Sequence, residues 1–180
     1  MAGLLLIATM GMAPVARGET PPDEYHVKAA FLYNFAKFIE WPDEKAGSPG
    51  DFPLCVLGSE SDPVLTALDS LQGKTVRGLP LTTRRVATLG EARTCRILFV
   101  TSSERPRLPE ILSALRGRPV LTVGDTNGFA ERGGIINLVK AGNRISFEIN
   151  TDAAQRAGLT MSSKLLFLGK IVKPGVPAGD

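Results

Sequence analysis

Residues 95–101, CRILFVT, predict a β-strand in the core of the protein, because apolar and β-branched residues follow one another there almost without interruption. Two other short apolar runs, PLCVLG at 53–58 and PVLTV at 119–123, predict strands of the same kind. A helix signal stands between them, where Asp62 followed by Pro63 is a typical helix start. This alternation predicts an α/β fold, a single-domain sandwich with a mostly parallel sheet flanked by helices.

The remaining predicted elements are short and follow the same rhythm. They are a strand at 79–86, a short helix opened by a capping box of Thr88 and Glu91, a hairpin of 135–139 and 145–149, and helices at 151–157 and 161–172. In the last helix the apolar residues surround the axis instead of forming one stripe, which predicts burial on several sides.

The stretch 23–41, DEYHVKAAFLYNFAKFIEW, predicts an aromatic-rich amphipathic helix that ends before Pro42. Lys28 falls in the middle of the apolar arc, and we expect its stem to lie along the aromatic rings while the ammonium reaches water. The arc is wider than a surface helix needs, which leaves two alternatives, packing between two layers or contact with a partner. We expect a homodimer, with the interface candidates Phe31, Phe35, Phe38 and Leu168.

The first 18 residues predict a secretory signal peptide. A short apolar run from Leu4 to Met10 precedes Ala16-Arg17-Gly18, which is a small-x-small cleavage pattern. The run is too short to span a membrane, so we expect no membrane insertion after cleavage. The predicted organisation is therefore a signal peptide at 1–18 and one domain at 19–180.

Charge and motifs exclude several classes of function. The formal net charge of +3 falls to +2 when Arg17 is removed with the signal, which is too little to predict nucleic-acid binding. The nine arginines within 77–118 leave open an anionic ligand, self-association or a solvated surface. Gly73-Lys74-Thr75 lacks the upstream glycine of a phosphate-binding loop, and the only histidine, His26, has no metal-ligand neighbours in the sequence. We expect no enzyme activity, no metal and no cofactor.

Six motifs carry a resemblance to a known family. They are YHVKAAFLYNFAKFIEWP at 25–42, LCVLG at 54–58, LQGKTVRGLPL at 71–81, CRILFVTSSE at 95–104, VLTVGDTNGFAERGGIINLV at 120–139 and RISFEINTDAAQRAGLTMSSKLL at 144–166. Read in order, they resemble the YfiR-like family of periplasmic regulatory proteins across the whole mature chain.

The resemblance implies an α/β fold, dimerisation and inhibition of an inner-membrane partner. The best-understood member restrains a membrane diguanylate cyclase through the periplasmic sensor region of that enzyme. We therefore expect a periplasmic repressor that lowers cyclic di-GMP and biofilm formation. The alternatives are a periplasmic small-molecule binding or sensor module and an adaptor for a sensor kinase or another receptor.

The resemblance also bears on individual residues. The pattern alone leaves open whether Cys55 and Cys95 are free core thiols or a disulfide; the resemblance and export to an oxidising compartment imply an intrachain disulfide. Phe147, Glu148 and Arg156 lie within the resembling segment and are candidates for contact with a partner or ligand. The alternative for the two charged residues is an ion pair within the chain.

Overall fold

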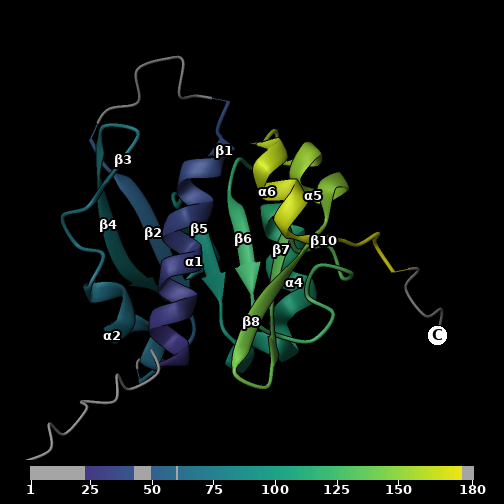
Figure 1. The fold of residues 1–180 in the computed structure, drawn as a ribbon, viewed down its shortest axis with the longest axis horizontal. Helices are drawn as coiled ribbons and strands as arrows, with labels where there is room; N and C mark the ends of the chain where they lie inside the picture. Colours follow the sequence, from purple (N-terminus) through teal and green to yellow (C-terminus); the bar gives the residue numbers. More distant parts are fainter. Residues whose placement is uncertain (1–22, 43–49, 60, 176–180) are drawn as a thin grey trace, which may run out of the picture.

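The computed structural model describes residues 23–42, 50–59 and 61–175 (Figure 1). Its central sheet has eight strands in the spatial order β10-β8-β7-β6-β5-β2-β4-β3. The strands are β2 (Phe52–Leu57), β3 (Thr75–Val76), β4 (Leu79–Val86), β5 (Ile97–Val100), β6 (Leu121–Gly124), β7 (Ile136–Ala141), β8 (Arg144–Ile149) and β10 (Lys170–Ile171). Neighbours from β4 to β7 are parallel, whereas β3 and β8 pair antiparallel with β4 and β7. The predicted mixed, mostly parallel α/β sheet is confirmed, and the predicted signal peptide at 1–18 lies outside the described residues.

Helices cover both faces of this sheet. The helical segments are α1 (Glu24–Phe38), α2 (Pro63–Asp69), α3 (Leu89–Ala92), the 3-10 segment η2 (Ser102–Arg107), α4 (Leu108–Leu115), α5 (Thr151–Arg156) and α6 (Ser163–Leu168). In Figure 1, α1 crosses in front of the sheet, α4 lies behind it, and α5 and α6 sit together at one end. The predicted caps are present, since Asp62 accepts a hydrogen bond from the Val64 amide and Thr88 forms the full capping box with Glu91.

Strand β5 joins the two cores of the domain. Its Ile97 and Phe99 belong to the apolar cluster beneath α1 and α2, whereas Leu98 and Val100 belong to the cluster beneath α3 and α4. Side chains of a strand point alternately to the two faces, so a strand covered on both faces must be apolar throughout. The uninterrupted run in the sequence reflects this position.

The first helix is shorter than the predicted 23–41. It ends at Phe38, and the next two residues form β1 (Ile39–Glu40), which pairs antiparallel with β9 (Thr160–Met161). The Phe38 carbonyl accepts a hydrogen bond of 2.9 Å from the Ser162 amide. Pairing with a segment 120 residues away therefore overrides the local helical pattern, a tertiary effect that sequence periodicity does not contain.

The last helix also ends early, so the helix predicted over 161–172 is confirmed only over Ser163–Leu168. A β-carbon at Gly169 would lie 2.6 Å from atoms of both Phe147 and Ile149, which shows how closely the chain passes β8 there. After this contact the chain continues as β10, whose two residues pair parallel with β8. The predicted burial on several sides is wrong, because Phe167 is 90% exposed.

In the connection from β6 to β7, one aromatic ring packs between two glycines. The ring of Phe129 is fully buried, and β-carbons at Gly124 and Gly134 would lie 2.4 Å and 2.1 Å from its carbons. Parallel neighbours need a long connection, and here a segment without a helix is held down by one ring between two glycines. These two glycines are required for close packing.

This packing predicts the effect of adding one methyl group. Gly134→Ala should lower the free energy of unfolding by about 1–3 kcal/mol or more, because the Phe129 ring cannot be displaced without disturbing a closely packed core. Gly90→Ala is the matched control, because Gly90 is exposed in α3, a β-carbon there would meet only the Thr88 hydroxyl oxygen at an ordinary contact distance of 3.8 Å, and alanine is the better helix former. Urea denaturation of both variants tests this; equal stabilities would contradict the packing role of Gly134.

Candidate functional site

Three large apolar side chains are exposed within the described residues, and all belong to the carboxyl-terminal segment. Phe167, Leu168 and Ile171 are 90%, 69% and 48% exposed, and we call them the α6 surface. Ser162 caps α6 through the Leu165 amide, and Leu165 is the buried residue of this helix. One side of this short helix is packed and the other is uncovered. Because exposed apolar patches usually mark contacts, the α6 surface is a candidate interaction site.

A pocket lies beside the α6 surface, between α5 and α6. Its volume is about 460 Å³, and it is lined by Thr151, Ala154, Gln155, Gly158, Leu159, Thr160, Met161 and Leu166. Leu166 belongs to the same helix as the α6 surface, and Thr160 and Met161 are the residues of β9. A concave site and an exposed apolar surface therefore share one helix. The pocket can bind a side chain of a partner, and the exposed side chains can bind in a groove of that partner.

The segment that carries the α6 surface has charges of a single sign. Residues 162–175 contain Lys164, Lys170 and Lys173 and no acid. All three lysines are exposed, and only Lys170 makes an ion pair with a described residue, at 3.1 Å from Glu148. A partner that covers the apolar side chains and presents acids at the edge would match this segment.

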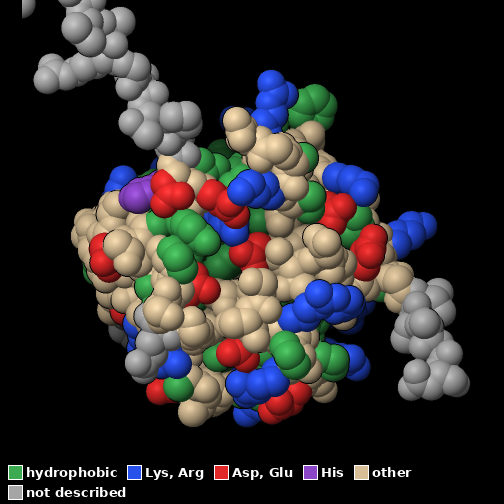
Figure 2. Space-filling view, turned by 90° about the horizontal axis from the view of Figure 1, so that it is seen from below, with side chains coloured by type: hydrophobic (Ala, Val, Ile, Leu, Met, Phe, Trp, Pro, Cys, Tyr) green, Lys and Arg blue, Asp and Glu red, His purple; other side chains and the backbone are tan. Residues whose placement is uncertain are grey.

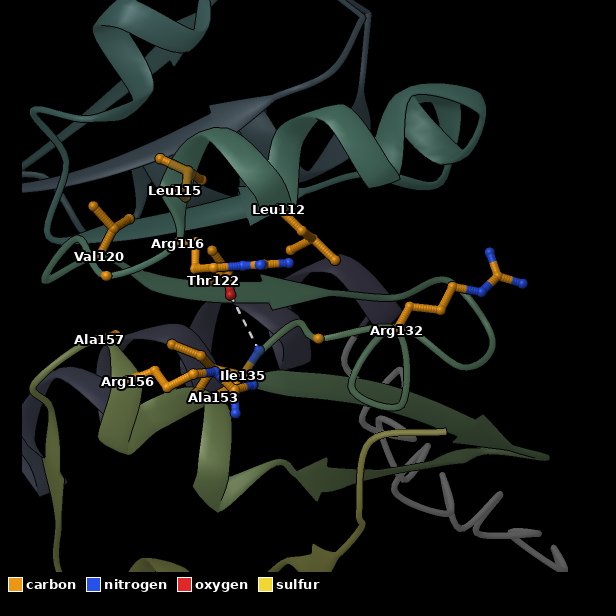
Figure 3. Close-up of a pocket in the computed structure, with 12 residues that line it drawn as sticks. Leu112, Leu115, Arg116, Val120, Thr122, Arg132, Ile135, Ala153, Arg156 and Ala157 are labelled. Atoms are coloured by element: carbon orange, nitrogen blue, oxygen red, sulfur yellow. Dashed lines mark hydrogen bonds between the residues drawn. The ribbon is translucent and has the colours of Figure 1, made fainter. Parts of the chain in front are cut away.

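The structure places Phe147, Glu148 and Arg156 in three different environments. Phe147 is buried against α1, with its ring 5.6 Å from Phe31 and 5.2 Å from Phe35. Glu148 accepts hydrogen bonds from Asn137 and from Lys170, so its ion pair within the chain is with Lys170 and not with Arg156. Arg156 lines a separate cavity between α4 and α5 (Figure 3). The three residues do not form one site.

The four dimer-interface candidates also separate. Phe35 is 1% exposed and Phe31 and Phe38 are partly buried against the core, so these rings are used in packing α1. Leu168 belongs to the α6 surface. Its neighbour Phe167 and the later Ile171 were missed, because the sequence pattern gave no sign that the helix would end at Leu168.

Charged side chains of both signs meet at the carboxyl end of the parallel strands, which faces the viewer in Figure 2. The Lys28 ammonium lies 2.7 Å from the Asp125 carboxylate and 2.9 Å from that of Glu24, which also pairs with Lys140. The Lys28 side chain is 7% exposed, so the prediction that its ammonium reaches water is wrong. Asp125 at the end of β6 supplies the buried partner that allows the charge to stay inside.

The pairing shifts two pKa values. Burial opposes the charge on Lys28, but its hydrogen bonds with Asp125 and Glu24 outweigh this and raise its pKa above the ordinary 10.5. Hydrogen bonds from Lys140 and Lys28 lower the pKa of Glu24 below the ordinary 4.5. The charged groups of this cluster are paired with one another, which makes the cluster structural.

Removing the central cation should therefore destabilise the protein in a pH-dependent way. Lys28→Met keeps the apolar stem and should lower the free energy of unfolding at pH 7 by about 2–4 kcal/mol, because Asp125 loses its partner and Glu24 keeps only Lys140. Lys37→Met, on the exposed side of the same helix, should cost less than about 1 kcal/mol.

The sign of the pH effect follows from the shifts. The contribution of Glu24 is complete above 4.5 and is lost as the pH falls through the lowered pKa, whereas that of Lys28 is complete below 10.5 and is lost as the pH rises through the raised pKa. Denaturation of wild type and Lys28→Met can be followed from about pH 7 to about pH 3.5. The difference between their free energies of unfolding should become smaller below pH 4.5. A difference that stays constant would contradict the pairing.

The two cysteines form the disulfide that the resemblance implies. Cys55 in β2 and Cys95 before β5 have a Cα–Cα distance of 6.0 Å and are 40 residues apart. Both are buried beneath α3 and α4. Closing a loop of this length stabilises the folded state by about 4 kcal/mol in the chain-entropy model, so we assign the bond a structural role.

Residues 23–42, 50–59 and 61–175 contain no group of three or more His, Cys, Asp or Glu side chains that is arranged to hold a metal ion. No helix in those ranges has the length and apolar character that a membrane span requires.

The comparisons with known proteins agree with the resemblance. The model of the YfiR/HmsC-like family matches residues 25–170. A conserved domain protein from Vibrio cholerae has a TM-score of 0.55 at 11% identity, over 82% of this chain and 60% of that one. At this identity the similarity concerns the fold alone.

Two further solved structures are similar below a TM-score of 0.5. The ABC domain in complex with L-Trp from Streptococcus pneumonia has a TM-score of 0.48 at 14% identity, over 67% of this chain and 55% of that one. CD0873, a substrate binding protein with adhesive properties from Clostridium difficile, has a TM-score of 0.49 at 13% identity, over 73% of this chain and 57% of that one. The chain thus spans 55% to 60% of the length of the three solved structures.

Proposed function

This chain belongs to the YfiR/HmsC-like family, and we propose that it is a periplasmic regulator that represses an inner-membrane signalling protein. The partner we propose is a diguanylate cyclase, so that repression lowers cyclic di-GMP and biofilm formation. The family implies a regulatory, non-catalytic protein. The observation that carries the proposal for this chain is the α6 surface, an apolar surface on a segment whose charges are all basic.

The disulfide supports the proposed compartment. Disulfides form and persist in oxidising compartments such as the bacterial periplasm, and Cys55–Cys95 joins two neighbouring strands of the central sheet region. Together with the signal-like first 18 residues, this favours an exported protein.

A protein of this kind regulates by binding one state of its partner better than the other. To move a partner from 99% active to 99% inactive, the affinity for the inactive state must be greater by about 5.5 kcal/mol. Apolar side chains supply such a difference when they are covered in only one of the two states, because each fully buried Leu or Phe contributes about 1.5–3 kcal/mol. We assign this role to Phe167 and Leu168, with the α5–α6 pocket as the adjoining concave contact.

The proposal is tested by deletion and complementation. Deleting the gene should raise cyclic di-GMP, and periplasmic wild-type protein should restore the low level where cytoplasmic protein does not. The double variant Phe167→Ser/Leu168→Ser should fail to restore it while keeping its unfolding temperature, because both side chains are already exposed. Arg144→Ser is the control, because Arg144 is exposed as the first residue of β8, which begins at the other end of the domain, and this variant should restore repression fully (Figure 1).

Two results would contradict this. Unchanged cyclic di-GMP in the deletion strain, with a membrane diguanylate cyclase expressed, would reject a cyclase as the partner and favour an adaptor for a sensor kinase or another receptor. Full repression by the Phe167→Ser/Leu168→Ser variant would reject the α6 surface as the contact.

A homodimer is the second candidate occupant of the α6 surface. A two-fold pair of α6 surfaces would cover Leu168, the one dimer-interface candidate that is exposed, but would compete with the membrane partner. Light scattering of the purified chain decides between them. Twice the monomer mass for wild type and a single mass for Leu168→Ser would assign the surface to the dimer.

A further inference from the structure

A second cavity lies on the other side of α5, between α4 and α5, with a volume of about 370 Å³ (Figure 3). We infer that this cavity is a binding site for a small amphipathic anion, a carboxylate or phosphate group carried on an apolar body. The inference is independent of the partner proposed above, because none of the residues that line this cavity lines the α5–α6 pocket or belongs to the α6 surface.

The cavity lies where β6 has no strand partner on one side. Strand β7 begins at Ile136, opposite Val123 of β6, so the sheet is open beside Thr122. The Thr122 hydroxyl oxygen bridges the opening by accepting a hydrogen bond of 3.1 Å from the Ile135 amide. Thr122 is 4% exposed, and its hydroxyl hydrogen remains available to donate into the cavity, since no described residue accepts it.

Three arginines from three parts of the chain line this cavity. Arg116 follows α4, Arg132 lies in the β6–β7 connection and Arg156 ends α5. None of them makes an ion pair or side-chain hydrogen bond with a described residue, and no acid is among the lining residues. Figure 3 shows Arg116 and Arg156 extending into the space between the two helices, whereas Arg132 stands at the rim and points away. Such an uncompensated pair favours an anion, and guanidinium groups suit carboxylate and phosphate oxygens in particular.

The rest of the lining is apolar. It consists of Leu112, Leu115, Val120, Ile135, Ala153 and Ala157, together with two glycines. A bare inorganic anion would leave these side chains against water, whereas an apolar body attached to the anion would cover them. The volume lies within the range of small-molecule sites, about 300–1,000 Å³, and is too small for a nucleic-acid strand.

Binding of four probes to the full mature chain tests the inference. The probes are 3-phenylpropionate, phenyl phosphate, inorganic phosphate and the uncharged 3-phenylpropanol, each titrated while backbone amide shifts are recorded by NMR. At least one of the two aromatic anions should bind saturably, with shifts concentrated at 112–122, 132–135 and 153–157. Inorganic phosphate and 3-phenylpropanol should bind at least about tenfold more weakly, because each lacks one half of the required chemistry. The stronger aromatic anion identifies the preferred head group.

Charge-neutral variants locate the anion. Arg116→Gln and Arg156→Gln should each weaken the better probe by about tenfold or more, and added salt should weaken it in the wild type. Arg118→Gln removes the same charge two residues from Arg116 but outside the cavity, and should leave the dissociation constant within about twofold. The three substituted residues, Arg116, Arg118 and Arg156, are exposed, so the unfolding temperatures of the variants should match that of wild type.

Several outcomes would overturn the inference. One is that neither aromatic anion reaches saturation below about 10 mM. Another is that 3-phenylpropanol binds as tightly as the better aromatic anion. If Arg118→Gln and Arg156→Gln weakened binding of the probe equally, the effect would be a general one of net charge. Saturable shifts at other residues would place the site elsewhere, a result that the wild-type titration gives even if a variant fails to fold.

Discussion

The close approach of Gly169 to β8 determines the form of the carboxyl-terminal region. No side chain fits at this position, because Phe147 and Ile149 occupy the space that a β-carbon would need. The chain must leave the helical path there, so α6 ends after six residues and β10 joins the sheet edge. Phe167 and Leu168 then lie on the uncovered side of a helix that is too short to bury them.

The same contact links this region to the first helix. Phe147 packs on one side against Gly169 and on the other against Phe31 and Phe35 of α1. The end of α1 is held in turn by the pairing of β1 with β9. The α6 surface is therefore presented by a segment fixed at both ends, and a rigid surface loses less entropy on binding than a mobile one. Helix α5 stands between the two concave sites, with Ala154 and Gln155 on one side and Ala153 and Arg156 on the other.

Local rules and longer-range contacts explain what the sequence predicts here and what it does not. The bounds of β4, the cap at Asp62 and the box of Thr88 with Glu91 follow from residues within a few positions of one another. The early ends of α1 and α6 depend on pairing with distant strands, and the buried charge of Lys28 depends on Asp125, 97 residues away. In the sequence Arg116 is one of nine arginines without an assigned role and Arg156 is a separate contact candidate, and only the fold brings them to one cavity.

The central claim is that the α6 surface is where this protein contacts its membrane partner. Hydrogen exchange of the mature chain, alone and with the purified periplasmic region of the membrane partner that we propose, tests this claim most directly. The account predicts slower exchange on binding at 163–171 and in β9, with α2, α3 and the β7–β8 turn unchanged. Slower exchange confined to another face, while the two proteins demonstrably bind, would contradict it.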